Sequence, residues 1–297
     1  MLNSKYLPFL CLLALSCSVK KQDSNLLNDE KETTINVQAI KKIDSAVHGL
    51  APIDGVSYLV SDTYSPIVQD RIVEIVPESN IRLSVNNFIQ QPGGILNQQG
   101  LITTTDIGRN LIQSVQNETI VDSWDVFVPW NVIAYDSNRL LATYGLSNGG
   151  IALLQPGGQA QIFISGLQNP FDLARDSRGN IWVSEQGLNG QSPGRVTQYN
   201  VNGEILQRIT EVVFQNPEGI ALDGSDNLYV ADTGASIVYA FNPEGGLIAQ
   251  TEANFVHLPI MMTNDIDGSI IGTGVFEGNN QVLRYSLVTD SETKESD

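Results

Sequence analysis

The chain has 297 residues, 41% of them hydrophobic, so it can bury the core of one large domain or two average ones. It carries 33 acidic and 16 basic residues, a formal net charge of −17. This balance excludes nucleic-acid binding and docking on an anionic membrane through a basic patch, because both need clustered Lys and Arg. The acidic excess is typical of a soluble surface, and the alternative is a face that captures cations.

The first 17 residues, MLNSKYLPFLCLLALSC, have the pattern of a bacterial signal peptide. Lys5 supplies the positive start, and Leu7–Leu15 is an apolar segment too short for a stable membrane span. It ends in Ala14-Leu15-Ser16-Cys17, which resembles a relaxed lipobox. The resemblance implies cleavage before Cys17 and lipidation of Cys17. Ordinary secretion and an uncleaved anchor are the alternatives.

Cys11 and Cys17 are the only cysteines, so the rest of the chain has no disulfide, thiol nucleophile or cysteine metal site. Ser18 is not the Asp that retains lipoproteins in the inner membrane of enteric bacteria. We therefore expect a lipid-anchored protein of the bacterial cell envelope, at the outer membrane, that meets the membrane through its lipid alone.

Polar segments flank the expected folded domain. Residues 18–33 hold only scattered apolar residues and predict a flexible tether, and residues 291–297 predict a disordered tail. We expect a signal peptide over 1–16, a lipid-anchored tether over 17–33 and a folded domain over 34–290. The first segment of that domain, Thr34–Ile40, alternates apolar and polar residues, which predicts a half-buried strand.

Residues 216–251 hold four short apolar runs separated by turn clusters of Gly, Asn, Asp and Pro. Runs of this length and composition fold as strands joined by hairpins. Four consecutive strands over about 40 residues have the length of one propeller blade.

The pattern of the first two runs, Pro-x-Gly-apolar-small-x-Asp followed by apolar-aromatic-Val-small-Asp, recurs along the chain. Its first residue, here called the anchor, falls at positions 47, 92, 129, 170, 217 and 259, with separations of 45, 37, 41, 47 and 42 residues. This spacing predicts an all-β, six-bladed propeller of four-stranded antiparallel blades. The last blade lacks an outer strand, so we expect Thr34–Ile40 to supply it and close the ring.

The residues at the turns support the same prediction. An Asp begins the first hairpin turn of several repeats, where its carboxylate can accept nearby backbone N–H groups: Asp176, Asp223 and Asp267. Residues that tolerate a positive φ follow these carboxylates: Gly179, Asn180, Asn227 and Gly268.

The stretch NPEGIALDGSDNLYVADTG resembles the NHL-repeat propellers. NPFDLARDSRGNIWVSEQG followed by GRVTQYNVNGEI is similar to repeats of the streptogramin-lyase (virginiamycin B lyase) family. Six such blades resemble, more distantly, the gluconolactonase/regucalcin (SMP-30) family. The resemblance covers about residues 45–288. It implies the propeller fold, whereas these families share a fold more than a function.

Two rings of side chains are expected at one mouth of the channel, on what we call the mouth face. The residues after the anchors form the first ring: His48, Gly93, Trp130, Phe171, Glu218 and Ile260. The last residues of the second strands form the other: Asp62, Thr105, Tyr144, Glu185, Asp232 and Gly274.

Three carboxylates of these rings, Glu218, Asp232 and Glu185, are candidate ligands for Ca²⁺ or Mg²⁺, the only cofactors that the sequence suggests. The gluconolactonase resemblance implies a divalent metal held by acids and Asn at the mouth, and only Glu218 occupies a matching place. The alternative is that Asp62, Glu185 and Asp232 cap the turns that follow them.

His48 and His257 are the only histidines. The lyase resemblance implies a catalytic His, for which His48 is the candidate, with a structural role as the alternative; His257 is expected in a loop. Trp130, Phe171 and Tyr144 are candidate ligand-binding residues, since aromatic rings at a mouth can form a platform. Their alternative role is to plug the channel.

Three hypotheses of function follow. The leading hypothesis is a monomeric binding or scaffold propeller for a protein or small ligand at the mouth face. The alternative is a divalent-metal-dependent lactonase or streptogramin-lyase-like enzyme, with His48 as base. A structural envelope protein without a ligand is a third.

Overall fold

Short runs rich in β-branched and aromatic residues form strands throughout the chain, because each run is bounded by residues that favour turns. The computed structural model describes residues 33–43, 47–54, 58–62, 71–75, 82–85, 91–117, 119–187 and 192–289. No helix in these ranges has the length and hydropathy needed to cross a membrane. The predicted signal peptide, Cys17 and the C-terminal tail lie outside these ranges.

The described strands form four-stranded antiparallel sheets, six in all within these ranges. The first sheet holds β2 (Val47–Pro52), β3 (Tyr58–Asp62), β4 (Arg71–Ile75) and β5 (Arg82–Val85). The second holds β6 (Pro92–Gln98), β7 (Leu101–Asp106), β8 (Leu111–Gln116) and β9 (Thr119–Asp125). The third holds β10 (Pro129–Ala134), β11 (Leu140–Tyr144), β12 (Gly149–Leu154) and β13 (Gln161–Leu167).

The fourth sheet holds β14 (Pro170–Arg175), β15 (Ile181–Glu185), β16 (Arg195–Tyr199) and β17 (Ile205–Arg208). The fifth holds β18 (Pro217–Leu222), β19 (Leu228–Asp232), β20 (Ile237–Phe241) and β21 (Leu247–Gln250). The last holds β22 (Met262–Asn264), β23 (Ile270–Phe276), β24 (Asn279–Thr289) and, at its outer edge, β1 (Thr33–Lys42).

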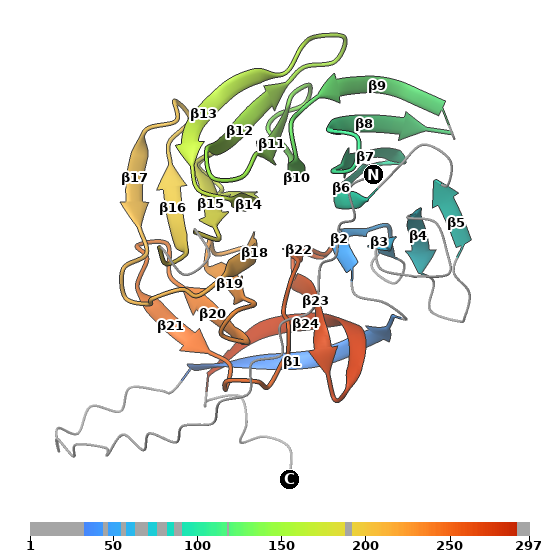
Figure 1. The fold of residues 1–297 in the computed structure, drawn as a ribbon. Coiled ribbons are helices and arrows are strands. Elements are labelled where there is room, and N and C mark those ends of the chain that lie inside the picture. The colour runs from blue at the N-terminus through green and yellow to red at the C-terminus, as the bar shows by residue number, and fades with distance from the viewer. Residues whose placement is uncertain are drawn as a thin grey trace, which may run out of the picture. The chain divides into compact units, whose positions relative to one another are not determined.

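The sheets of the unit Glu32–Asp297 stand around a common centre, with the first strand of each repeat innermost (Figure 1). Neighbouring innermost strands contact each other in the order β2, β6, β10, β14, β18 and β22, and β22 contacts β2. The prediction of an all-β propeller with four-stranded antiparallel blades is confirmed.

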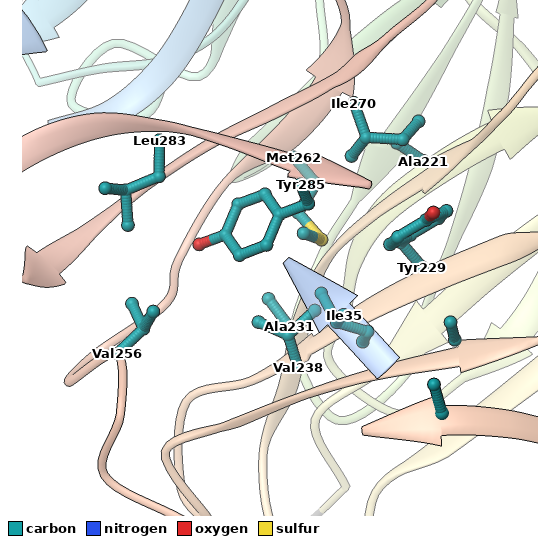
Figure 2. Close-up of a cluster of buried hydrophobic side chains, with 12 residues drawn as sticks. Ile35, Ala221, Tyr229, Ala231, Val238, Val256, Met262, Ile270, Leu283 and Tyr285 are labelled. Carbon is teal, nitrogen blue, oxygen red and sulfur yellow. The ribbon is translucent and has the colours of Figure 1, made fainter. Parts of the chain in front are cut away.

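The N-terminal strand β1 runs antiparallel to β24 from Thr33, opposite Thr289, to Lys42, opposite Gln281. Ile35 of β1 points into a buried cluster that includes Val238 and Tyr285 (Figure 2). The segment predicted as a strand over 34–40 is therefore paired along one edge and packed against the fifth sheet.

Three repeats have Gly two places after the anchor, and crowding at the centre explains it: Gly49, Gly94 and Gly219. A Cβ on Gly219 would lie 2.5 Å from the carbonyl oxygen of Ile260, and one on Gly94 would overlap the side chain of Asn131. Any larger side chain there would push neighbouring innermost strands apart.

The predicted turn carboxylates bond the backbone of their own hairpins. Asp176 accepts the N–H of Asn180 at 2.8 Å, and Asp223 accepts that of Asn227 at 3.0 Å. Gly179 has the predicted positive φ of 86°, as does Gly268 at 81°. The prediction for Asn180 and Asn227 is wrong: in the fifth sheet Asp226 takes the left-handed position, with φ 62°.

Candidate functional site

In the first five sheets the anchor pairs directly with the end of the second strand, so the two predicted rings share the mouth face there. Pro129 lies opposite Tyr144, Pro170 opposite Glu185, and Pro217 opposite Asp232. The last sheet differs from the prediction: Pro259 precedes β22, and β23 continues to Phe276, so Gly274 does not end its strand.

The second sheet departs from the prediction by one residue. Pro92 lies opposite Asp106, so Thr105 is not the end of its strand. The prediction placed the end of this strand one residue too early. Pro92 and Asp106 are 14 residues apart, whereas the matching pairs of the first, third, fourth and fifth sheets are 15 apart, because the two-residue turn Gln99-Gly100, with φ values of 54° and 91°, makes a tighter hairpin.

Hydroxyl groups fix the backbone of the mouth ring. Thr105 donates to the carbonyl oxygen of Trp130 at 3.0 Å and Thr143 to that of Phe171 at 2.8 Å, each reaching the next sheet. Ser184 donates to the carbonyl oxygen of Glu218 at 2.5 Å. In the second, third and fourth sheets, a Ser or Thr one place before the end of the second strand therefore holds the following sheet in position, a signal that the sequence contains and that our sequence analysis missed. Ser61 has the same place in β3, but its hydroxyl makes no such bond.

The fifth sheet carries Ala231 at this place and has no hydroxyl to donate. There the backbone N–H of Gly219 donates directly to the carbonyl oxygen of Ile260 at 2.7 Å. The link between neighbouring sheets is kept by a different donor.

Glu218 is a partly buried carboxyl surrounded by side-chain donors. Its Oε1 accepts Asn216 Nδ2 at 2.8 Å and Gln186 Nε2 at 2.9 Å, and its Oε2 accepts Thr233 Oγ1 at 2.9 Å. Burial raises its pKa to about 7, although these three hydrogen bonds favour the ionised form. The carboxyl is thus poised to change charge near neutral pH.

Asp232 and Glu185 are committed to backbone groups at the same face. Asp232 is fully buried, and its two oxygens accept the N–H groups of Gln215 and Asn216, each at 2.8 Å. Glu185 accepts the N–H of Gln168 at 2.7 Å and pairs with Arg195 at 3.0 Å. Both carboxylates therefore cap the loops around them.

These three carboxylates do not fit a Ca²⁺ or Mg²⁺ site as they are arranged. A cation needs the lone pairs that backbone N–H groups, Arg195 and the side chains around Glu218 already occupy. Among the described residues, no three His, Cys, Asp or Glu side chains gather closely enough to hold a metal ion.

The predicted aromatic pair is brought together. The rings of Trp130 and Phe171 stack with centroids 5.4 Å apart and planes inclined by 29°. Phe171 is buried in an apolar cluster against which Trp130 and Ile260 also pack, and Trp130 Nε1 donates to the carbonyl oxygen of Gly145 at 3.1 Å. The pair closes the centre of the mouth with apolar side chains, and Trp130 remains partly exposed.

Tyr144 ends β11 and is partly exposed, and it packs against the buried cluster that contains Trp124 and Val132, not the cluster of Trp130 and Phe171. Two exposed apolar side chains flank it on connecting segments: Phe127, 63% exposed, and Leu146, 47% exposed. These segments are joined, because the N–H of Gly145 donates to the carbonyl oxygen of Phe127 at 3.0 Å. This side of the mouth therefore presents apolar surface to solvent.

The remaining sequence-predicted residues are less fully placed. His48 lies in β2 and Asp62 ends β3, but their side chains lie outside what the structure describes. Cys17 lies outside the described residues altogether. His257 is exposed in the segment before the last anchor, as expected, and its backbone bridges Val275.

Asp172 is a buried carboxyl that our sequence analysis missed. It is 1% exposed, accepts the N–H of Ile220 at 2.8 Å and that of Leu173 at 2.7 Å, and also accepts Asn131 Nδ2. Burial raises its pKa to about 7. The sequence signal is that Asn131 and Asp172 stand two places after their anchors, where three other repeats have Gly and the last has Met261.

Comparison with known proteins finds similarity in fold. No family model and no curated protein sequence matches the chain. Among solved structures, virginiamycin B lyase from Staphylococcus aureus is 12% identical, with 86% of this chain and 88% of that chain covered and a TM-score of 0.60. A gluconolactonase from Xanthomonas campestris is 14% identical, with 85% and 90% covered and a TM-score of 0.63.

A chain in the nidogen/laminin complex is also similar, at 17% identity with 74% and 97% covered and a TM-score of 0.55. Identities this low show the fold alone, because propellers of one architecture host unrelated functions. By its fold, the chain is a β-propeller similar to the gluconolactonase and streptogramin-lyase propellers.

Proposed function

We propose that this chain is a binding propeller of the bacterial cell envelope, carried on a lipid at Cys17, and that its mouth face holds a partner protein. The observation that carries the proposal is the mouth itself. Its centre is closed by the Trp130–Phe171 pair, and its carboxylates are occupied by hydrogen bonds within the chain. A mouth built in this way offers contact surface in place of an open catalytic centre.

Exposed apolar side chains around the mouth support a protein as the partner. Segments that lead into the anchors or follow the second strands carry Phe127, Leu146, Val213, Phe255 and Leu258, each between 46% and 79% exposed. Seven other large apolar side chains of the described residues are exposed on outer strands or on turns of the opposite face. The support therefore rests on Phe127 and Leu146, whose segments are joined by the hydrogen bond from Gly145 to Phe127, since neighbouring exposed apolar side chains mark interaction sites. The partly exposed Trp130 adds the kind of residue that dominates binding energy at interfaces.

The direction of β1 sets the orientation that we infer for this face. Lys42 lies opposite Gln281, which pairs with Gly274 at the mouth, so Thr33 begins β1 at the opposite face. Residues 18–32 separate Cys17 from Thr33 and span about 50 Å at most. A lipid at Cys17 would therefore tether the propeller by the face opposite its mouth.

We also infer that the ring consists of six blades and that β1 closes it. In support, β1 pairs with β24 along nearly its whole length and packs against the fifth sheet through Ile35. Closure of this kind hides the strand edges that an open ring would expose.

Photo-crosslinking tests the binding face with a matched pair of positions. A photoreactive phenylalanine is placed at Leu146 on the mouth face or at Ile266, which is 63% exposed in the first hairpin turn of the last repeat, on the opposite face. In cells, we expect a discrete protein adduct from position 146 and none from position 266. Adducts of equal yield from both positions, or none from position 146, would contradict a binding mouth.

A second candidate is an enzyme, a lactonase or a lyase, and Glu218 is the observation that favours it. A carboxyl with a pKa of about 7 at the mouth of a propeller has the protonation behaviour of a general acid or base. Gluconolactonase and virginiamycin B lyase share this fold. Hydrolysis of lactones or cleavage of cyclic depsipeptides that is lost in Glu218→Gln would establish this function and displace the first proposal.

A further inference from the structure

The third repeat differs from its neighbours at the edge of the mouth. In the second, fourth and fifth repeats, Gln stands two places before the anchor and Gly stands two places after the residue opposite the anchor: Gln90 with Gly108, Gln168 with Gly187, and Gln215 with Gly234. The third repeat has Phe127 and Leu146 at these two places, and their side chains are 63% and 47% exposed. Because the other repeats form the same connections with polar or small residues, the fold does not require these two apolar side chains.

A third position changes together with these two. The residue opposite the anchor is an acid in the same three repeats: Asp106, Glu185 and Asp232. Glu185 and Asp232 accept the backbone N–H of the Gln two places before their anchors, at 2.7 and 2.8 Å. The third repeat has Tyr144 there, so it lacks this carboxylate. We call Phe127, Tyr144 and Leu146 the apolar corner.

Backbone hydrogen bonds hold the apolar corner and join it to the centre of the mouth. The N–H of Gly145 donates to the carbonyl oxygen of Phe127 at 3.0 Å, and the N–H of Asn169 donates to that of Leu146 at 2.8 Å. The carbonyl oxygen of Gly145 accepts Nε1 of the partly exposed Trp130 at 3.1 Å. The exposed side chains therefore stand on a backbone that is already ordered, which lowers the entropic cost of binding.

The charge around the apolar corner is negative. Asp125 is exposed two residues before Phe127, and within the described part of the chain it makes no ion pair. Arg109, in the turn between β7 and β8, lies 4.0 Å from Asp106 and offsets that carboxylate. The whole chain carries a net charge of −17. Two copies of this chain therefore repel each other, whereas a basic partner is attracted.

We propose that the apolar corner docks a basic segment of a partner protein, which places an apolar side chain against Phe127 and Leu146 and Lys or Arg side chains around them. This inference rests on the function proposed for the mouth and names the chemistry of its partner. Neighbouring exposed apolar side chains supply the contact, and the negative charge around them selects the flanking residues.

Two variants test the two parts of this proposal, each with a matched control. Phe127→Ser removes the apolar contact at an exposed position, where folding is little affected. Its control is Gln215→Ser, at the same place in the fifth repeat. Asp125→Lys reverses the charge beside the corner. Its control is Glu244→Lys, which changes the net charge equally but lies exposed in the turn between β20 and β21, on the opposite face.

Two labelled synthetic peptides are the probes for the purified protein: Lys-Lys-Leu-Phe-Leu-Lys-Lys and the same peptide with Glu in place of each Lys. By fluorescence anisotropy, we expect the Lys peptide to bind and the Glu peptide to bind about tenfold more weakly. Phe127→Ser and Asp125→Lys should each weaken binding of the Lys peptide about tenfold, and the two control variants should leave it unchanged. Equal binding of the two peptides, no binding of the Lys peptide, or an equal loss in the controls would overturn the proposal.

Photo-crosslinking in cells separates this inference from the proposed function on which it rests. With the photoreactive phenylalanine at position 146, Asp125→Lys should lower the yield of the protein adduct about tenfold, whereas Glu244→Lys should leave it unchanged. An adduct whose yield Asp125→Lys does not change would overturn the basic partner and leave the binding mouth standing. The absence of any adduct from position 146 would overturn both.

Discussion

Replacing Glu218 by Gln removes a carboxyl whose pKa is raised by burial, and the variant should therefore depend less on pH for its stability. In the folded protein this pKa is about 7, against an ordinary value of 4.5. The contribution of protonated Glu218 to the free energy of unfolding is fully present below about pH 4.5 and is lost as the pH rises through about 7.

The size of the effect follows from the shift. Between pH 5.5 and 8.5 the unfolded state is ionised throughout, while the folded state loses its proton near pH 7. Over this range the wild type should lose about 2 kcal/mol of unfolding free energy through Glu218, since one pKa unit corresponds to about 1.4 kcal/mol.

Gln should fit the site without rearrangement. Its amide oxygen can accept Asn216 and Gln186 as Oε1 of Glu218 does. Its NH₂ can donate to Thr233 Oγ1, because that hydroxyl also has the carbonyl oxygen of Pro259 within 2.6 Å as an acceptor. The variant should therefore fold like the wild type.

Urea unfolding of both proteins at pH 5.5, 7 and 8.5 measures the difference. Relative to the wild type, Glu218→Gln should gain about 2 kcal/mol between the lowest and highest pH. Asp172, whose pKa is also about 7, remains in both proteins and cancels in the comparison. A difference between the two proteins that is constant from pH 5.5 to 8.5 would refute the raised pKa of Glu218.

Three further predictions concern how the ring is held. Deleting residues 34–42 should lower the melting temperature by more than 10 °C or abolish folding, as measured by circular dichroism; an unchanged melting temperature would exclude a fastening role for β1. Thr143→Val should cost about 2 kcal/mol in urea unfolding, because it leaves a buried N–H and a buried C=O unpaired, whereas Thr143→Ser should cost less than half as much. Arg284→Met should cost about 3–5 kcal/mol, because it leaves the buried Asp265 without its cation, and adding Asp265→Asn should recover most of the loss; an additive double variant would contradict the coupling.

The repeat pattern was sufficient to predict the fold, because local information recurs at a regular spacing: an anchor in each repeat, Gly two places later in three of them, and a turn carboxylate in all but the second. The residue-by-residue pairing of the strands was harder to predict from the sequence. The second sheet slips by one residue through the turn Gln99-Gly100, whose effect on pairing depends on both flanking strands.

The sequence predicts where the candidate site lies, but it does not predict which hydrogen bonds its carboxylates make. The sequence brings Trp130, Phe171 and Glu218 to one face, and the structure stacks the two rings as expected. The roles of Asp232 and Glu185 depend on loop backbones that fold back to meet them, which strand periodicity does not reveal.

Thermal unfolding of the metal-stripped protein, with and without 1 mM CaCl₂ or MgCl₂, tests the central claim most directly. The account of the mouth as a binding face predicts a melting temperature that changes by less than about 1 °C with either ion, and no turnover of lactones or cyclic depsipeptides. A specific site filled at a hundred times its Kd would add about 2.7 kcal/mol, a shift of several degrees. Such a shift, lost in Glu218→Gln and accompanied by turnover, would contradict the account.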